Sequence, residues 1–204
     1  MIYNFAYFYI VLHQAIKMDI DVILDQIYAL PLVSKNALKA HIEEVEHPKG
    51  HILMRENKPE RDIYLLKKGI VRAYANYNGH EVTFWFGKEG QLVASMNNYV
   101  RNENSYEDIE LLEDCVFYKL KNVTLQSLYE TDIHIANWGR KLAEYSLVEA
   151  EQRLISRLIK TASERYKDLL NEESDLLARV KLSHIASYLG ITQVSLSRIR
   201  AEVR

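Results

Sequence analysis

The chain has 204 residues and a net charge of −2, with 48% hydrophobic and 26% charged residues, the balance of an ordinary soluble globular protein. This length suffices for one large domain or two small ones. A single cysteine, Cys115, excludes a disulfide or a cysteine-ligated metal site within the chain, and we interpret it as a core residue of a cytoplasmic protein.

The first residues are unusual because Met1 to Ile16 contain no Asp, Glu, Lys or Arg. The stretch is short of the roughly 20 apolar residues that a membrane-spanning helix needs, and it lacks the basic start of a signal peptide. We therefore interpret residues 1–17 as an extension that precedes the native start, and we expect no membrane association. Residues 18–150 are predicted to form a sensor domain and residues 151–204 a DNA-binding domain.

Residues 19–46 show helical spacing of apolar positions, interrupted at Pro31. From His51 to Leu120 the pattern changes to short apolar or alternating runs separated by turn residues. Asn78-Gly79 joins two of these runs and is typical of a two-residue hairpin. Many short strands at near-regular spacing predict an antiparallel barrel or jelly roll. The fold class is therefore α+β, with an N-terminal antiparallel β-roll and a helical C-terminal part.

The helical pattern returns over residues 132–151, where four large apolar residues repeat at the 3-4-3 spacing of a coiled-coil seam. This pattern predicts a dimerisation helix over about 132–150; the alternative is that the stripe packs on the chain's own barrel. The predicted dimer contacts are Ile135, Trp138, Leu142 and Tyr145. A second amphipathic helix is predicted over residues 152–170.

The last thirty residues indicate two short helices joined at Gly190, where the chain must take a positive φ. Ser183 and Thr192 are predicted to cap these helices, and Ala186 lies where they cross. Charge supports the assignment: from Gln152 onward there are ten basic and six acidic residues, so a basic end follows an acidic body. The pattern predicts a helix-turn-helix.

The outward residues of the second helix suit the major groove of DNA. Arginine can pair with a guanine edge, glutamine with adenine, and an apolar side chain can touch a thymine methyl group. Hydroxyl groups, basic side chains and the helix N-terminus can bind phosphate. Predicted base contacts are Gln193, Val194, Ser197 and Arg198, and predicted phosphate contacts are Thr192, Ser195, Arg179, Lys181, Arg200 and Arg204.

From Ile20 to Val203 the chain resembles the cyclic-AMP receptor protein (Crp/Fnr) family of bacterial transcription regulators. The stretch IYLLKKGIVRAYANYNGHEVTFWFGKEGQLV is similar to the family's cyclic-nucleotide-binding β-roll, and GITQVSLSRIR to its recognition helix. The resemblance implies a homodimer on palindromic double-stranded DNA, with RNA polymerase as a further partner. It also implies a hinge near residues 147–152 through which the sensor domain moves the recognition helices.

The effector pocket departs from that family. In its cyclic-AMP binders a Gly-Glu pair holds the ribose and an Arg-Ser or Arg-Thr pair neutralises the phosphate. The corresponding residues here are Ala94, Ser95, Ser105 and Tyr106. Because a buried phosphate without its arginine is uncompensated, we expect a degenerate pocket that does not bind cyclic AMP, with an unknown effector and no cofactor.

The sequence predicts a transcription regulator and no enzyme, because the strands carry no cluster of metal-ligating His and Glu residues. The alternative is a small-molecule sensor or adaptor whose helical end binds protein. Exposed Gln193, Arg198 and Arg200 argue against that alternative, since a protein-binding face is richer in aromatic residues.

Overall fold

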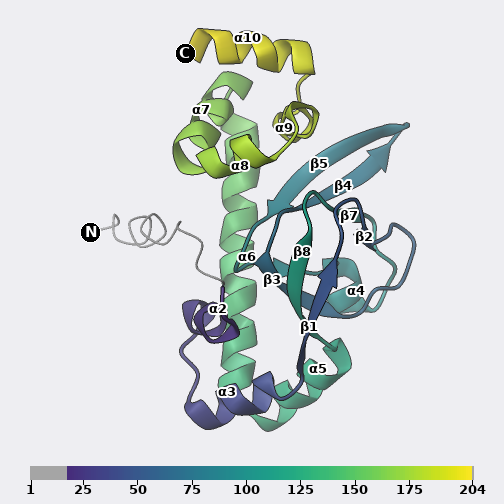
Figure 1. Cartoon of the computed structure of the whole chain (residues 1–204), viewed down its shortest axis with the longest axis vertical. Coiled ribbons are helices and arrows are strands. Elements are labelled where there is room, and N and C mark those ends of the chain that lie inside the picture. Colours follow the sequence, from purple (N-terminus) through teal and green to yellow (C-terminus); the bar gives the residue numbers. More distant parts are fainter. Residues whose placement is uncertain (1–17, 204) are drawn as a thin grey trace.

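The computed structural model describes residues 18–203. The predicted extension (residues 1–17) and Arg204 lie outside the described residues. Along the long axis of the molecule, a β-roll packs beside one long helix, and a helical C-terminal unit lies beyond both (Figure 1). This arrangement confirms the predicted fold class, an antiparallel β-roll followed by helices.

The roll consists of two four-stranded antiparallel sheets, with strand orders β1-β8-β3-β6 and β2-β7-β4-β5. The strands are β1 (Ile42–His47), β2 (Ile52–Met54), β3 (Ile63–Lys68), β4 (Val71–Tyr77), β5 (His80–Gly87), β6 (Leu92–Val93), β7 (Asp108–Leu111) and β8 (Cys115–Leu120). Asn78 and Gly79 join β4 to β5 with φ angles of 51° and 80°, as predicted for a two-residue hairpin. Ile42, which was expected in a helix, begins β1 instead, because it pairs with Leu120 of β8.

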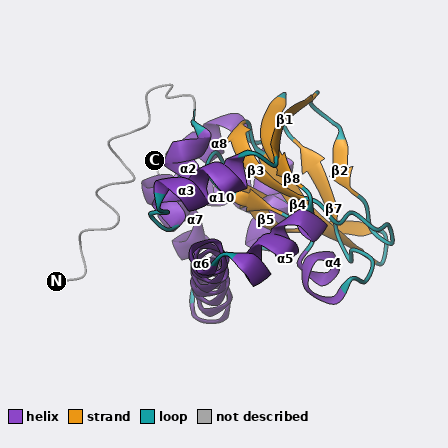
Figure 2. Cartoon of the chain, turned by 90° about the horizontal axis from the view of Figure 1, so that it is seen from below, coloured by secondary structure: helices purple, strands orange, loops and turns teal. Residues whose placement is uncertain are grey.

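Alternation along β3 explains how two separate cores form. Tyr64 and Leu66 face the second sheet and join the cluster between the sheets, whereas Ile63 and Leu65 point outward to the helices. All four residues are buried, so β3 is covered on both faces. The helices on its outer face are α2 (Ile20–Ile27), α3 (Leu32–Lys39), α5 (Asn122–Thr131) and α6 (Ile133–Ile159), seen from below in Figure 2.

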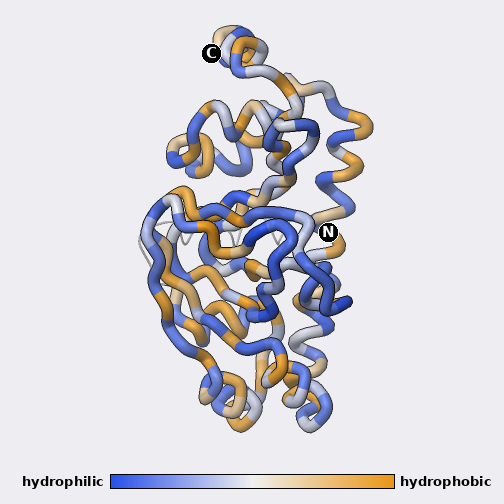
Figure 3. The backbone as a smooth tube through the Cα atoms, turned by 90° about the vertical axis from the view of Figure 1, so that its right-hand side faces the viewer, coloured by the Kyte–Doolittle hydropathy of each residue, from blue (hydrophilic) through white to orange (hydrophobic). Residues whose placement is uncertain are grey.

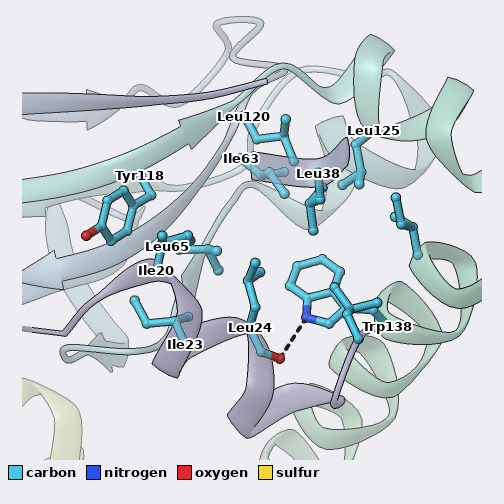
Figure 4. Packing of buried hydrophobic residues seen from close by; sticks show 12 residues of the cluster. Ile20, Ile23, Leu24, Leu38, Ile63, Leu65, Tyr118, Leu120, Leu125 and Trp138 are labelled. Carbon is cyan, nitrogen blue, oxygen red and sulfur yellow. Dashed lines mark hydrogen bonds between the residues drawn. The ribbon is translucent and has the colours of Figure 1, made fainter. Parts of the chain in front are cut away.

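Trp138 of α6 occupies the centre of this outer core. Its side chain is fully buried, and its indole Nε1 donates a hydrogen bond to the backbone oxygen of Leu24 at 3.2 Å (Figure 4). Leu24 and Leu38 are also fully buried in the cluster. The N-terminal part of α6 is therefore anchored by the two helices that precede the roll.

Helix α6 runs without interruption from Ile133 to Ile159. The break expected near residue 151 does not occur; the helix ends eight residues later, and Asp132 caps its start by accepting hydrogen bonds from the backbone of His134 and Ile135. The predicted hinge segment, residues 147–152, lies inside this helix.

The C-terminal unit contains α7 (Ala162–Glu172), α8 (Ser174–Arg179), α9 (Leu182–Leu189) and α10 (Gln193–Val203). Its core includes Ile185 and Leu196, and it also takes in Ile70, Phe86 and Leu112 from the roll. The unit therefore packs on the roll as well as following α6. Figure 3 shows apolar and polar residues alternating along the strands and these helices, as elements with one buried face require. Between residues 18 and 203, no helix is long and apolar enough to cross a bilayer.

Candidate nucleic-acid interface

Gly190 makes the turn between α9 and α10. It ends α9 in the left-handed region, with a φ of 69°, and its N–H bonds to the carbonyl groups of Ala186 and Ser187. The N–H of Ile191 then bonds to the oxygen of Ala186 at 3.0 Å. These bonds satisfy the last carbonyl groups of α9 and set the entry of the next helix, as the glycine turn predicts.

Thr192 caps the second helix, as predicted. Its Oγ1 accepts a hydrogen bond from the N–H of Ser195 at 3.1 Å and lies 3.0 Å from the Ser195 hydroxyl. The prediction for Ser183 was wrong: the N-cap of α9 is Lys181, two residues earlier, and it makes no side-chain capping bond. The first helix depends on packing in place of a cap.

The inner faces of both helices are buried, and the outer face of α10 is open. Ile185, Leu189 and Leu196 are at most 1% exposed, whereas Val194 is 63% exposed. All four predicted base-contacting residues are exposed on α10, at the far end of the molecule (Figure 1). They are Gln193, Val194, Ser197 and Arg198. The structure thus brings this predicted set together on one element.

The predicted phosphate contacts fall into two groups, those available on the C-terminal unit and those that are not. Lys181 and Thr192 are exposed, and Ser195 and Arg200 are half-buried on the same unit. Arg204 lies outside the described residues. Arg179 was wrongly predicted: its Nη2 lies 2.7 Å from Glu89 Oε1 and 2.6 Å from Glu113 Oε2. The hydrogen bonds that Arg179 donates to Glu113 and Glu89 raise the pKa of its guanidinium. This side chain therefore joins the C-terminal unit to the roll and is committed to two carboxylates.

Three side chains that the sequence reasoning missed hold the helix-turn-helix in place. Arg165 donates to the backbone oxygen of Leu189 at 2.6 Å, and Arg157 to that of Tyr188 at 2.7 Å. Ser187 accepts from the N–H of Thr83 at 2.9 Å and donates to an oxygen of β5. Their backbone partners leave no pattern in the sequence, so nothing there indicated these roles.

The predicted dimer seam is only partly available. Ile135 and Trp138 were wrongly predicted as dimer contacts, because both are fully buried in the chain's own core. Leu142 is half-buried against the same cluster, and Tyr145 is 46% exposed. The stripe therefore packs on its own domain at first, which was the alternative considered for it, and becomes exposed farther along the helix.

A cleft of about 2520 Å³ lies between the roll and α6, and it contains part of the predicted effector pocket. Ala94 and Tyr106 line the cleft, whereas Ser95 and Ser105 are each 1% exposed and are not among its lining residues. Ser95 precedes α4 (Met96–Arg101), and Ser105 follows it. The sequence reasoning missed Glu107, which lines the cleft although it is only 3% exposed. The available signal was the alternation along the strand: Glu107 lies two residues before Ile109 and four before Leu111, and both of these are buried.

Comparison with known proteins supports this architecture. Residues 44–132 match the cyclic nucleotide-binding domain family. FixK2 from Bradyrhizobium japonicum superposes with a TM-score of 0.70 at 22% identity, covering 79% of this chain and 84% of that protein. A putative Crp/Fnr-family regulator from Eubacterium rectale gives a TM-score of 0.67 at 18% identity, covering 83% and 82%.

The catabolite activator protein of Thermus thermophilus gives a TM-score of 0.55 at 18% identity, covering 89% of this chain and 86% of that protein. Among curated protein sequences, none matches the chain. The architecture described above has three parts: a roll of two antiparallel sheets, a long connecting helix and a terminal helix-turn-helix. Residues 44–132 thus resemble a cyclic nucleotide-binding domain, and the chain shares its fold with these solved regulators of the Crp/Fnr type.

Proposed function

We propose that the protein is a homodimeric, sequence-specific DNA-binding transcription regulator. The observation that carries the proposal is the open face of α10, where Gln193, Val194 and Arg198 are all exposed on a helix that Gly190 and Thr192 hold in place. A helix of this kind enters the major groove with its N-terminal residues toward the bases. Arg198 pairs with a guanine edge, Gln193 with adenine, and Val194 meets a thymine methyl group.

The remaining exposed polar groups of the unit serve as phosphate contacts. Lys181 and Thr192 lie at the starts of α9 and α10, where backbone N–H groups also favour an anion. On α10, Ser195 lies between the base-contacting residues, and Arg200 follows them. Contacts of this class fix the position of the protein on the duplex and carry no sequence information. RNA polymerase remains the expected partner of the DNA-bound protein.

Dimerisation is assigned to the second half of α6. Tyr145, Val148, Ile155 and Ile159 recur at spacings of three, seven and four residues, the period of a coiled-coil seam, and each is between 46% and 72% exposed. Leu147, Leu154 and Leu158 form a second stripe beside it, and Leu158 is 75% exposed. An apolar face of this extent is costly in water and is relieved when two copies of α6 pair.

Two-fold pairing of α6 places two recognition helices on one side of the dimer. The expected DNA site is then a palindrome whose half-sites lie about 34 Å apart, one helical turn. We further propose that cyclic AMP is not the effector. Ser105 stands where the phosphate-binding arginine would be, and the carboxyl group of Glu107 is buried two residues away.

The test is selection of binding sites from random DNA by the purified protein at near-physiological salt. The native chain is compared with Arg198→Ala and with Arg101→Ala, a matched control because Arg101 is an exposed arginine of the roll. We expect a two-fold-symmetric site, relaxed at one base pair by Arg198→Ala at a cost of about 1–3 kcal/mol and unaffected by the control. Cyclic AMP in a parallel sample is expected to change nothing.

If the native chain enriches no site with or without cyclic AMP, the DNA-binding proposal fails. The sensor or adaptor with a protein-binding helical end then becomes the better reading. If cyclic AMP is required for enrichment, the proposal about the pocket fails while the regulator stands.

A further inference from the structure

One wall of the cleft combines a carboxylate with three aromatic rings. The wall is formed where β4, β5 and β7 lie beside the segment that follows α4. Its lining residues are Ala73, Phe84, Trp85, Tyr106, Glu107 and Ile109. The other side chains of this wall are apolar or aromatic. The charge of a bound ligand therefore strongly affects its affinity, because the carboxyl group is the only charged group among the six.

Glu107 supplies the only carboxylate among those six side chains. One of its oxygens accepts a hydrogen bond from the N–H of Tyr106 at 3.1 Å. Burial raises the pKa of the carboxyl group, the neighbouring Ser95 hydroxyl and backbone N–H groups lower it, and the Asp108 charge raises it further. The carboxylate is therefore buried beside a second negative charge, in surroundings that favour a positive partner.

Two of the cations that line the larger cleft are engaged elsewhere. Lys67 pairs with Glu44 at 2.6 Å, and Arg179 is held between Glu89 and Glu113. Within residues 18–203, no basic side chain forms an ion pair with Glu107. A cationic ligand beside Glu107 would meet its complement, whereas an anionic ligand there would meet the carboxylate. Arg101, exposed on α4, lines a second, small pocket with Tyr106 and forms no ion pair with Glu107.

The aromatic rings favour the same charge. Phe84 is 37% exposed and Tyr106 is 55% exposed, and their ring centroids are 6.3 Å apart with the planes tilted by 37°. Trp85, the next residue on β5, is half-buried against the core between the sheets and also lines the cleft. The faces of Trp, Tyr and Phe attract a cation within about 6 Å, and aromatic rings of this kind recognise ammonium groups.

We propose that this wall of the cleft binds an organic cation, with Glu107 as counter-ion and Phe84, Trp85 and Tyr106 as the aromatic contacts. The ligand class is an amine that carries an apolar group. The inference deepens the proposed function, because it names the chemical class of effector that the sensor domain takes. It also accounts for a pocket that has lost the arginine needed for a phosphate.

The test uses four probes and the purified full-length protein without DNA. Phenethylamine is positive, 2-phenylethanol is its neutral analogue, 3-phenylpropionate is negative, and cyclic AMP carries the phosphate. Binding is measured by isothermal titration calorimetry and by fluorescence of Trp85, which lines the cleft, while Trp138 is buried under α2. We expect phenethylamine to bind at least about tenfold more tightly than the neutral analogue, and the two anions to bind more weakly still.

Variants separate binding from folding. Glu107→Gln is expected to lose the preference for the amine, at least about tenfold in affinity, yet to raise the melting temperature because an unpaired buried charge is removed. Glu103→Gln is the matched control, since Glu103 is an exposed glutamate four residues away. Phe84→Leu is expected to weaken amine binding and Phe84→Tyr to restore it, because only the second keeps the ring.

The proposal is overturned if cyclic AMP or 3-phenylpropionate binds as tightly as phenethylamine, or if Glu107→Gln binds the amine like the native chain. It is equally overturned if none of the probes binds at millimolar concentration. Site selection on random DNA does not depend on these probes, so failure here and failure of the proposed function are read from separate experiments.

Discussion

The two halves of α6 have the same apolar periodicity and opposite surroundings. In the first half, Ile135 and Trp138 are fully buried beneath α2, α3 and α5. In the second half, Leu147 is 70% exposed and Leu158 is 75% exposed. A repeat of 3.5 residues specifies which face of a helix is apolar, and it does not specify whether that face meets its own chain or another copy.

The difference arises from what the rest of the chain supplies. Helices α2 and α3 reach only the beginning of α6, and Trp138 fixes that contact with its bond to Leu24. Beyond Tyr145, the cleft separates one side of α6 from the described elements of the roll. The first half therefore contributes to folding of the chain, and we assign the second half to association.

The largest expected effect is that of Trp138→Ala. Removing a fully buried indole leaves a large cavity and deletes one of the two hydrogen bonds to the Leu24 oxygen, which keeps the bond from the N–H of Tyr28. We expect the free energy of unfolding to fall by about 3–5 kcal/mol. Urea denaturation followed by circular dichroism measures this loss. Trp138→Phe, which retains much of the volume, is expected to lose less. If Trp138→Ala unfolds like the native chain but is monomeric, the assignment of the first half to folding is wrong.

An intermediate effect is expected from Leu154→Glu combined with Leu158→Glu. Both positions are more than half exposed in one copy, so the unfolding free energy of the monomer changes little. Burying two carboxylates at a helix pair is costly, and we expect dimer affinity to fall by at least about 100-fold in analytical ultracentrifugation. Val123→Glu on α5, at a residue 76% exposed, is the control. A variant that remains dimeric would place the interface elsewhere.

The smallest expected effect concerns the contact between the C-terminal unit (α7–α10) and the roll. His184 of α9 is half-buried with its Nδ1 unpartnered, and it faces Arg72, Glu81, Glu110 and Lys181. Burial, then the Arg72 charge, lower its pKa from the ordinary 6.5. Protonation therefore favours the opened state: the contact is fully stable above pH 6.5 and weakens as the pH falls through the lowered pKa.

The measurement compares melting temperatures at about pH 7.5 and about pH 5.5. His184→Gln is expected to reduce the acid-induced loss, whereas His134→Gln, at an exposed residue of α6, leaves it unchanged. The acid-induced loss is expected to be confined to α7–α10 in hydrogen exchange, leaving the Trp138 core protected. If protection is lost around Trp138 before it is lost in α7–α10, the acid-sensitive contact is not the one that His184 makes with the roll.

Local patterns allowed much of this fold to be predicted. Alternation identified the strands, Asn78-Gly79 identified the hairpin, and Gly190 with Thr192 identified the helix-turn-helix. Each signal depends on the conformation of a few neighbouring residues. Contacts between distant segments were not predictable in this way: Arg179 reads as a basic surface residue until Glu89 and Glu113 lie beside it. The same holds for Trp138, whose partner Leu24 is 114 residues away.

The unbroken course of α6 has a mechanical consequence. At a rise of 1.5 Å per residue, its 27 residues make a rod of about 40 Å. One end is clamped in the core of the roll and the other leads into the helices that carry α10. A tilt of about 5° at the clamped end displaces the free end by about 3.5 Å, close to the rise of one DNA base pair. In the regulator proposed above, such a lever would convert a small change at the cleft into a change of register at the operator.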